Sequence, residues 1–311
     1  MKIKRVLVLG GGGFIGVNLV KMLVQHQWTV WIYELPGSNV NKLLMGSSVN
    51  VVFGTLADTN KIIEVVEQQN ISLIIHLISS IIPNSSFNEY RDDQINVVYP
   101  TFDLIHIMGL KKIKFVFLSS GGSIYGENNL LIPFVETDPL MPICYYGQSK
   151  LTIEEMIRLE SRYTGLEYLI IRPSNPYGPG QRIDAKQGFI STVIGKALRH
   201  EEIVIWGDGT VVRDYIYIED LVSIICRLID TEESGVFNVG SGKGYSLNNI
   251  LSILDKNTNI PLKVRYAQKR NIDVSFSLLD INKLRKVLTP NFIDIEEGVY
   301  RFWAYVSSND N

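Results

Sequence analysis

The sequence has little of what metal sites, disulfides and membrane spans require. Only two cysteines and four histidines occur among 311 residues, and neither type has metal-ligand spacing. We therefore expect no metal and reduced thiols, as in a cytoplasmic protein. No apolar run reaches the roughly 18 residues of a membrane span. The glycines from Gly10 to Gly13 interrupt the apolar N-terminus that a signal peptide would need.

Long blocks of basic residues are also absent. The formal net charge is −2, and the densest basic group is Lys111, Lys112 and Lys114. We expect neither nucleic acid nor a membrane as a partner. The composition, 46% hydrophobic and 20% charged, is that of a globular protein with a substantial core.

Short apolar runs alternate with segments of helical periodicity over the first half of the chain. This alternation is typical of a parallel sheet covered by helices. We expect strands at residues 5–9, 29–33, 51–53, 73–76, 115–118 and 168–171, and helices at 14–25, 59–69, 88–110 and 146–163. Pro100 should kink or interrupt the third of these helices.

The pattern changes after Arg172, where three prolines and two glycines precede shorter, mixed elements. Residues 215–240 again have the pattern strand, helix, strand, at 215–217, 220–229 and 235–239, and we expect them to return to the sheet. The sequence therefore predicts an α/β fold, a Rossmann-type doubly wound parallel sheet with a smaller, discontinuous C-terminal α/β domain. The first domain would comprise residues 1–173 and 217–243, and the second residues 174–216 and 244–311.

A glycine-rich turn follows the first expected strand. Gly10, Gly13 and Gly16 stand where strand becomes helix, so backbone amides and the positive end of the helix dipole can approach a pyrophosphate. Glu34 ends the second strand, where a carboxylate accepts hydrogen bonds from the adenosine ribose and repels a 2′-phosphate. The pattern predicts a dinucleotide site and favours NAD over NADP.

A tyrosine and a lysine stand one helical turn apart in the segment YYGQSK. Tyr146 and Lys150 would share a helix face. Nearby positive charge should lower the pKa of the Tyr146 phenol, so that it accepts a proton from an alcohol near neutral pH. The pair alone is also compatible with an ordinary surface helix, but its position after the fifth strand of a dinucleotide fold favours catalysis.

These features occur together with Asn96 in INVVYPT and with the segments SSGGSIYG, RPSNPYGPGQ and RDYIYIED. In this combination the chain resembles the extended short-chain dehydrogenase/reductases, and among them the NAD-dependent nucleotide-sugar epimerase/dehydratase family. The resemblance covers nearly the whole chain. It implies that the first domain binds NAD, that the second binds a nucleotide-diphosphate sugar, and that helices near residues 88–109 and 146–162 form a homodimer.

The resemblance also implies a set of site residues. Tyr146 and Lys150 would be catalytic. The substrate would contact Asn175, Arg213, Arg270 and Asp273. The cofactor would contact Gly10, Gly13, Phe14, Ile15, Gly16, Glu34, Thr55, Leu56, Leu77, Asn96, Tyr146, Lys150 and Pro173. Thr55 departs from the aspartate of many relatives, and a small residue, Ser277, stands near a position where some relatives carry a bulky tyrosine that blocks N-acetylated sugars.

The catalytic hydroxyl of this family usually stands where this chain has Gly121. We favour Ser123 as its replacement, because the two adjacent glycines give the turn freedom to bring it to the substrate. Ser120, or Tyr146 acting with water, are the alternatives. Related dehydratases carry an Asp-Glu pair at this turn, in place of Gly121 and Gly122, so the resemblance implies chemistry limited to carbon 4 of the sugar.

The sequence thus predicts a nucleotide-sugar 4-epimerase, acting on a UDP-hexose or UDP-N-acetylhexosamine through a 4-keto intermediate with tightly bound NAD. One alternative is an NAD(P)H-dependent reductase of nucleotide 4-keto-6-deoxy sugars, which would use the same residues. Another is a catalytically silent NAD-binding protein. Glu34 disfavours NADPH, while Tyr146, Lys150 and a nearby serine disfavour the silent protein.

Overall fold

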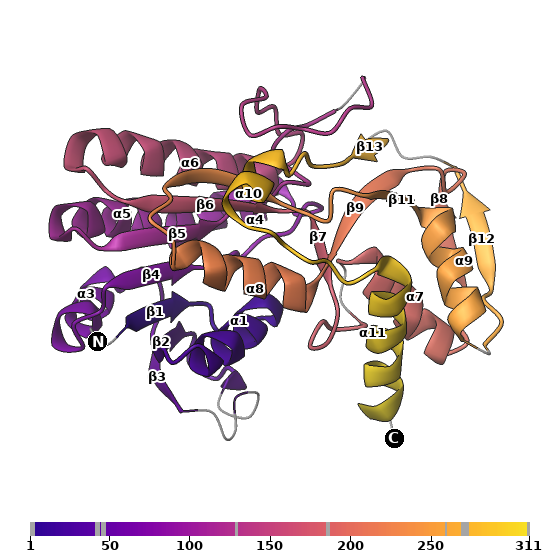
Figure 1. Ribbon diagram of the computed structural model, residues 1–311, viewed down its shortest axis with the longest axis horizontal. Helices are drawn as coiled ribbons and strands as arrows, with labels where there is room; N and C mark the ends of the chain where they lie inside the picture. Colours follow the sequence, from indigo (N-terminus) through magenta and orange to yellow (C-terminus); the bar gives the residue numbers. More distant parts are fainter. Residues whose placement is uncertain are drawn as a thin grey trace.

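The computed structural model describes residues 4–40, 44, 48–127, 130–184, 187–258, 260–268 and 274–309. Its larger part is a seven-stranded parallel sheet of order β10-β6-β5-β4-β1-β2-β3 (Figure 1). This confirms the doubly wound, Rossmann-type fold. The strands are β1 Arg5–Leu9, β2 Thr29–Glu34, β3 Val49–Phe53, β4 Leu73–His76, β5 Lys114–Leu118, β6 Tyr168–Pro173 and β10 Gly235–Val239.

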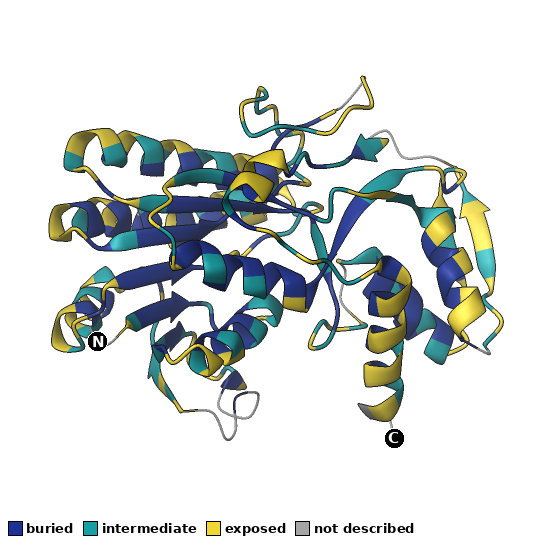
Figure 2. Ribbon diagram, in the orientation of Figure 1, coloured by how far each residue is buried: buried dark blue, intermediate teal, exposed yellow. Residues whose placement is uncertain are grey.

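Successive side chains of each strand enter two different hydrophobic cores. In β1, Val6 and Val8 face one core, while Leu7 and Leu9 face the other. Helices α1 Phe14–Gln25 and α8 Ile218–Ile229 cover the first face, and α3 Thr59–Gln68, α5 Tyr99–Lys111 and α6 Tyr145–Thr164 cover the second. Burial on both faces, visible as dark blue strands in Figure 2, explains the uninterrupted apolar runs of the sequence.

The single helix expected at residues 88–110 is divided. Helix α4 Phe87–Asp93 and helix α5 are joined by a π-helical turn, η1 Gln94–Val98, and Pro100 stands in the first turn of α5. A proline inside a continuous α-helix lacks the N–H for the carbonyl four residues earlier and collides with it. The wider π-turn relieves both problems, so the interruption expected at Pro100 is confirmed.

The remaining elements form a smaller α/β part, on the right of Figure 1. One small sheet contains β7 Asn175–Tyr177, β9 Val212–Tyr217, β11 Gly244–Ser246 and β13 Phe276–Ser277, and β8 Ile203–Trp206 pairs with β12 Val264–Ala267. The helices here are α7 Phe189–Leu198, α9 Leu247–Asn257 and α11 Ile295–Asn309, while α10 Asn282–Val287 contacts β10. Strand β10 pairs with β6, which confirms that the chain returns to the large sheet; the two domain ranges stay a prediction.

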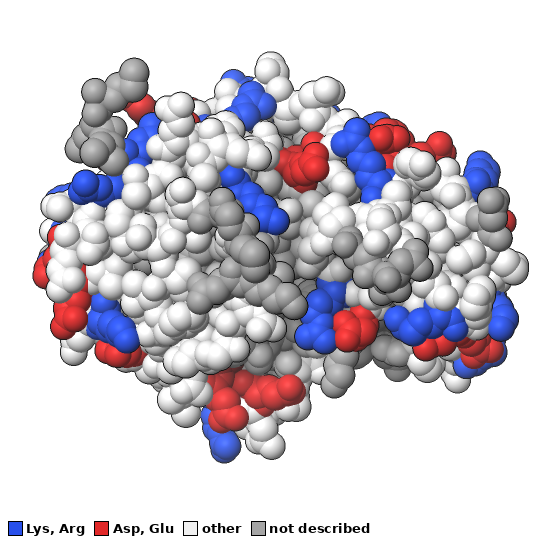
Figure 3. All heavy atoms as spheres, turned by 90° about the horizontal axis from the view of Figure 1, so that it is seen from below, with Lys and Arg blue, Asp and Glu red and all other residues white. Residues whose placement is uncertain are grey.

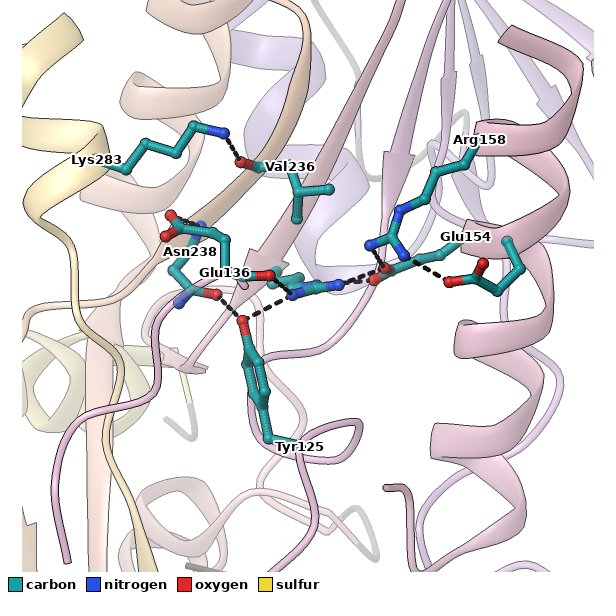
Figure 4. A network of polar contacts seen from close by, with 9 residues as sticks. Tyr125, Glu136, Glu154, Arg158, Val236, Asn238 and Lys283 are labelled. Carbon is teal, nitrogen blue, oxygen red and sulfur yellow. Dashed lines mark hydrogen bonds and ion pairs between the residues drawn. The ribbon is translucent and has the colours of Figure 1, made fainter. Parts of the chain in front are cut away.

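A buried ion pair connects the large sheet to α6 (Figure 4). Arg172 at the end of β6 donates from Nε and Nη2 to the two carboxylate oxygens of Glu154, at 3.1 and 2.7 Å, and neither side chain is exposed. Arg172 Nη1 also donates to the Tyr125 hydroxyl at 2.8 Å and to the Glu136 carbonyl at 3.1 Å. The Tyr125 hydroxyl in turn donates to Asn238 on β10 at 2.7 Å. The network therefore joins β6, α6, β10 and the turn after β5.

Removing one partner of this pair should be costly. We expect Arg172→Met to lower the free energy of unfolding by about 3–5 kcal/mol, because it leaves the buried Glu154 carboxylate without its bidentate partner. Urea unfolding measures the loss. Glu202→Gln, which breaks a surface pair with Arg265, is the control and should cost no more than about 1 kcal/mol. Equal losses in the two variants would contradict the role given to the buried pair.

Candidate functional site

A cleft of about 1590 Å³ runs past the glycine loop, the turn after β5, the start of α6 and the turn after β6. These segments follow the carboxyl ends of parallel strands, where open α/β sheets bind ligands. Seven of the cofactor residues expected from the sequence line the cleft: Gly13, Phe14, Ile15, Leu77, Tyr146, Lys150 and Pro173. The structure therefore brings together the two motifs, 130 residues apart, that indicated a dinucleotide site and a catalytic pair.

The glycine loop has the geometry that a pyrophosphate requires. Gly10 has a φ of 80°, and a Cβ atom on Gly16 would lie 2.5 Å from the Gly10 carbonyl oxygen, so no other residue fits there. Gly13 caps α1 without a side-chain hydrogen bond. The N–H groups of the first helical turn are thus left for an anion, and they lie at the cleft.

Glu34 stands at the end of β2 beside this loop. Its Oε2 accepts a hydrogen bond from the Gly12 amide at 2.7 Å, and its Oε1 accepts one from the Leu35 amide at 3.1 Å. A carboxylate oxygen can accept more than one hydrogen bond, so the group is held in place and can still receive ribose hydroxyls. The loop and Glu34 together fit NAD.

Six expected cofactor residues are not among those that line the cleft: Gly10, Gly16 and Glu34, described above, and Thr55, Leu56 and Asn96. Thr55 is exposed, and its carbonyl accepts a hydrogen bond from Tyr33, while Leu56 is buried in the second core. Asn96 is exposed and donates to the Asp92 carbonyl at 2.9 Å. Asn96 lies within the π-helical turn, which changes the direction of its side chain relative to a regular helix.

The turn after β5 places the hydroxyl of Ser120 beside the phenol of Tyr146. Ser120 is buried, and its hydroxyl interacts with the Tyr146 phenol. Ser123, which the sequence favoured, also lines the cleft. Burial raises the pKa of the Tyr146 phenol to about 12, while the Ser120 hydrogen bond opposes this rise. The sequence analysis expected a lowered pKa for Tyr146, whereas in the structure this pKa is raised.

Lys150 lies beneath Tyr146 and is almost fully buried. Its Nζ donates to the carbonyls of Leu118 at 3.0 Å and Ile78 at 3.4 Å, and it lies 5.7 Å from the centre of the Tyr146 ring. Burial lowers the pKa of Lys150 to about 8, against the attraction of the Asp93 and Glu154 carboxylates. Two carbonyls and two carboxylates thus support the ammonium form in a low-dielectric site.

Asp93 is a component of this site that the sequence analysis missed. It ends α4, is only 2% exposed, and accepts a hydrogen bond from the Ser80 hydroxyl at 2.5 Å. Its negative charge acts on both Lys150 and Tyr146. Asp93 is one of two adjacent aspartates in the sequence, and only the fold shows which of them points inward.

The other end of the cleft contains Asn175 and Arg213. Asn175 donates to the Asp214 carbonyl at 2.7 Å, and Arg213 donates to the carbonyls of Val212 and Val274 at 2.8 and 2.6 Å. Both also line a smaller pocket of about 250 Å³ between β7, β8 and α7. Arg270 and Asp273 lie outside the described residues. Ser277 is buried in β13 opposite Arg213 and is not among the residues that line the cleft.

Other kinds of site have less support. Within the described ranges, no three His, Cys, Asp or Glu residues gather as a metal would require. None of the helices placed by the structure has the length and apolarity to cross a membrane. On the face seen in Figure 3, basic and acidic side chains are intermixed rather than gathered by sign.

Residues 6–240 match the family model described as "NAD dependent epimerase/dehydratase family". The chain belongs to this family. The match spans the glycine loop, the Ser120 turn, Tyr146 and Lys150, and Arg213, and its NAD dependence agrees with the geometry around Glu34.

The proteins similar to this chain include both epimerases and a reductase. The chain is 32% identical to a "Putative UDP-glucose 4-epimerase" of Methanocaldococcus jannaschii, over 98% of this chain and 99% of that one. It is also 32% identical to a dTDP-4-dehydro-6-deoxyglucose reductase of Escherichia coli, over 89% of each. A solved UDP-glucose 4-epimerase of Thermotoga maritima, with UDP-glucose, superimposes with a TM-score of 0.92 at 29% identity, over 99% of this chain and 100% of that one.

The position of Glu34 gives a test of cofactor choice. We expect Glu34→Ala to weaken NAD binding about tenfold, the effect of losing a hydrogen bond to a charged group, and to narrow the preference for NAD over NADP because the 2′-phosphate is no longer repelled. Calorimetric titration with both nucleotides measures this change. Glu64→Ala, on the exposed face of α3, is the control. An unchanged ratio of the two affinities would refute the assignment.

Proposed function

We propose that this protein is a nucleotide-sugar 4-epimerase acting on a UDP-hexose or a UDP-N-acetylhexosamine. The observation that carries the proposal is the cleft that brings Ser120, Tyr146 and Lys150 together with the glycine loop. When bound, NAD supplies the hydride acceptor, and then the hydride donor, for carbon 4 of the sugar. The remaining chemistry is proton transfer and positioning by the chain's own side chains.

Tyr146 accepts the proton of the sugar 4-hydroxyl, and Ser120 donates a hydrogen bond to the same oxygen. A phenol with a pKa of about 12 is almost entirely protonated near neutral pH. Additional positive charge near the ring is therefore needed to favour the phenolate, which is the form that accepts a proton. The 4-keto sugar then presents its other face, and Tyr146 returns the proton to the new hydroxyl.

The nucleotide diphosphate of the substrate occupies the end of the cleft with Asn175 and Arg213, because a guanidinium suits diphosphate oxygens. Arg270 and Asp273 belong to the same proposed set. In this arrangement residues 1–173 and 217–243 hold NAD, and residues 174–216 and 244–311 hold the nucleotide sugar. Both cysteines are unpaired, which supports a reducing compartment such as the cytoplasm.

A second candidate is the reduction of a nucleotide 4-keto-6-deoxy sugar. The identity to the Escherichia coli reductase equals that to the archaeal protein, and the same tyrosine, lysine and serine would protonate the sugar oxygen. The larger number of similar proteins named as epimerases favours the first candidate.

We also propose a homodimer. Large apolar side chains are exposed on consecutive helices of one sheet face: Ile95 on η1, Tyr99 and Leu110 on α5, and Leu159 and Tyr163 on α6. A second copy of the chain would bury them against the same residues about a twofold axis, as the family resemblance implies.

The reaction is tested without added cofactor. The purified protein is incubated with UDP-glucose, UDP-galactose and their N-acetylated counterparts, and the epimers are separated. We expect one pair to interconvert, Tyr146→Phe to be inactive, and Ser120→Ala to lose about a hundredfold in kcat, with Ser123→Ala much less affected. If no pair interconverts but a dTDP-4-keto-6-deoxy sugar oxidises NADH, the protein is the reductase. Greater loss in Ser123→Ala than in Ser120→Ala would assign the hydroxyl to Ser123.

The dimer is tested by sedimentation. We expect the wild-type protein to sediment as a dimer and the double variant Leu159→Glu, Tyr163→Glu as a monomer, because two carboxylates per chain would be buried at the interface. Tyr300→Glu, at another exposed tyrosine on α11, should leave the dimer intact. A wild-type monomer would contradict the proposal.

A further inference from the structure

Position 121 requires a glycine because neighbouring atoms fill the space of a Cβ atom, and not because of its backbone conformation. Gly121 does not have a positive φ, so an L-residue could adopt its conformation. A Cβ atom there would lie 2.6 and 3.0 Å from the two methyl carbons of Leu279, and 3.0 Å from the Pro173 carbonyl oxygen. The space that a serine would use is therefore filled by Leu279.

Leu279 is held firmly in this place. It is 2% exposed, and its segment pairs with Phe134: the Phe134 amide donates to the Leu278 carbonyl at 2.9 Å, and the Asp280 amide donates to the Phe134 carbonyl at 2.8 Å. The Phe134 ring stacks on Tyr125 at 4.6 Å between centres, and Tyr125 belongs to the Arg172 network. The backbone on either side of Leu279 is therefore fixed, and its side chain is packed in the first core.

The opposite side of the turn is fixed by β6. The Ser119 amide donates to the Ile171 carbonyl at 2.8 Å, and the Gly121 amide donates to the Pro173 carbonyl at 2.7 Å. The backbone on either side of Ser120 is thus tied to β6, with Leu279 packed against the turn. The Ser120 hydroxyl, on this turn, interacts with the Tyr146 phenol and lines the same cleft.

We infer that Leu279 is a positioning residue for the catalytic hydroxyl: it occupies the volume of a side chain at position 121 and so holds the turn with Ser120 on Tyr146. The inference rests on the proposed function, since it gives Ser120 its role. The inference explains why position 121, where the family usually carries the catalytic hydroxyl, is a glycine. The hydroxyl of Ser120 then takes the catalytic role.

The same segment also meets the nucleotide end of the cleft, but at other residues. Val274 accepts a hydrogen bond from Arg213, and Ser277 pairs with Arg213 in the small sheet. Truncating Leu279 leaves these contacts in place, so its effect should fall on the chemical step and not on substrate binding.

The first test is kinetic. We expect Leu279→Ala to lose at least about tenfold in kcat, because a small displacement of a catalytic group is costly, with KM changed by less than about twofold. Leu279→Met should retain most of the activity. Leu284→Ala, which opens a cavity in the same core away from the turn, is the control and should keep its kcat. The reaction assayed is whichever of the two candidate reactions the wild-type protein performs.

The second test does not depend on activity. Thermal unfolding of the wild type, Gly121→Ser, Leu279→Ala and the double variant forms a double-mutant cycle. We expect Gly121→Ser to lower Tm in the wild-type background and to cost much less in the Leu279→Ala background, where the double variant should also recover kcat relative to Leu279→Ala. Additive changes in Tm, or an unchanged kcat in Leu279→Ala, would overturn the inference. An inactive wild type with a coupled cycle would instead count against the proposed function alone.

Discussion

The buried pair of Arg172 and Glu154 is the contact on which the geometry of the site depends. Burying two charges is expensive unless their hydrogen bonds are satisfied, and here the guanidinium reaches a carboxylate, a phenol and a carbonyl. Each partner lies close to a proposed functional residue: Arg172 immediately precedes Pro173, Glu154 is one helical turn from Lys150, and Tyr125 ends the serine turn. The pair therefore fixes the three segments that form the centre of the cleft relative to one another.

Burial shifts the pKa values of the two proposed catalytic groups, Tyr146 and Lys150, in opposite directions. It raises the pKa of Tyr146 and lowers that of Lys150, so the protein alone favours a neutral phenol and weakens the hold on the ammonium proton. The carboxylates of Asp93 and Glu154 favour the lysine charge, but Asp93 also disfavours the phenolate. A bound cofactor that adds positive charge beside the Tyr146 ring would favour the phenolate.

The sequence predicted what depends on local patterns. Apolar runs identified all seven strands of the large sheet, the glycine loop gave the start of α1, and Pro100 gave the break before α5. The uncertain points depended on contacts between distant residues. Asn96 is exposed within the π-turn, and Asp93 is buried at the end of α4. The hydrophobic periodicity of these two segments predicts neither the exposure of Asn96 nor the burial of Asp93.

The choice between Ser120 and Ser123 is the clearest case of such long-range dependence. Seen locally, two glycines indicate a flexible turn, which favours the serine with more freedom to move. In the fold, the first glycine is close-packed against Leu279, 158 residues further along the chain, and the turn is tied to β6 on its other side. A residue that departs from a family pattern at a catalytic position therefore has to be interpreted together with the side chain that fills its space, because the two define a single position in the structure.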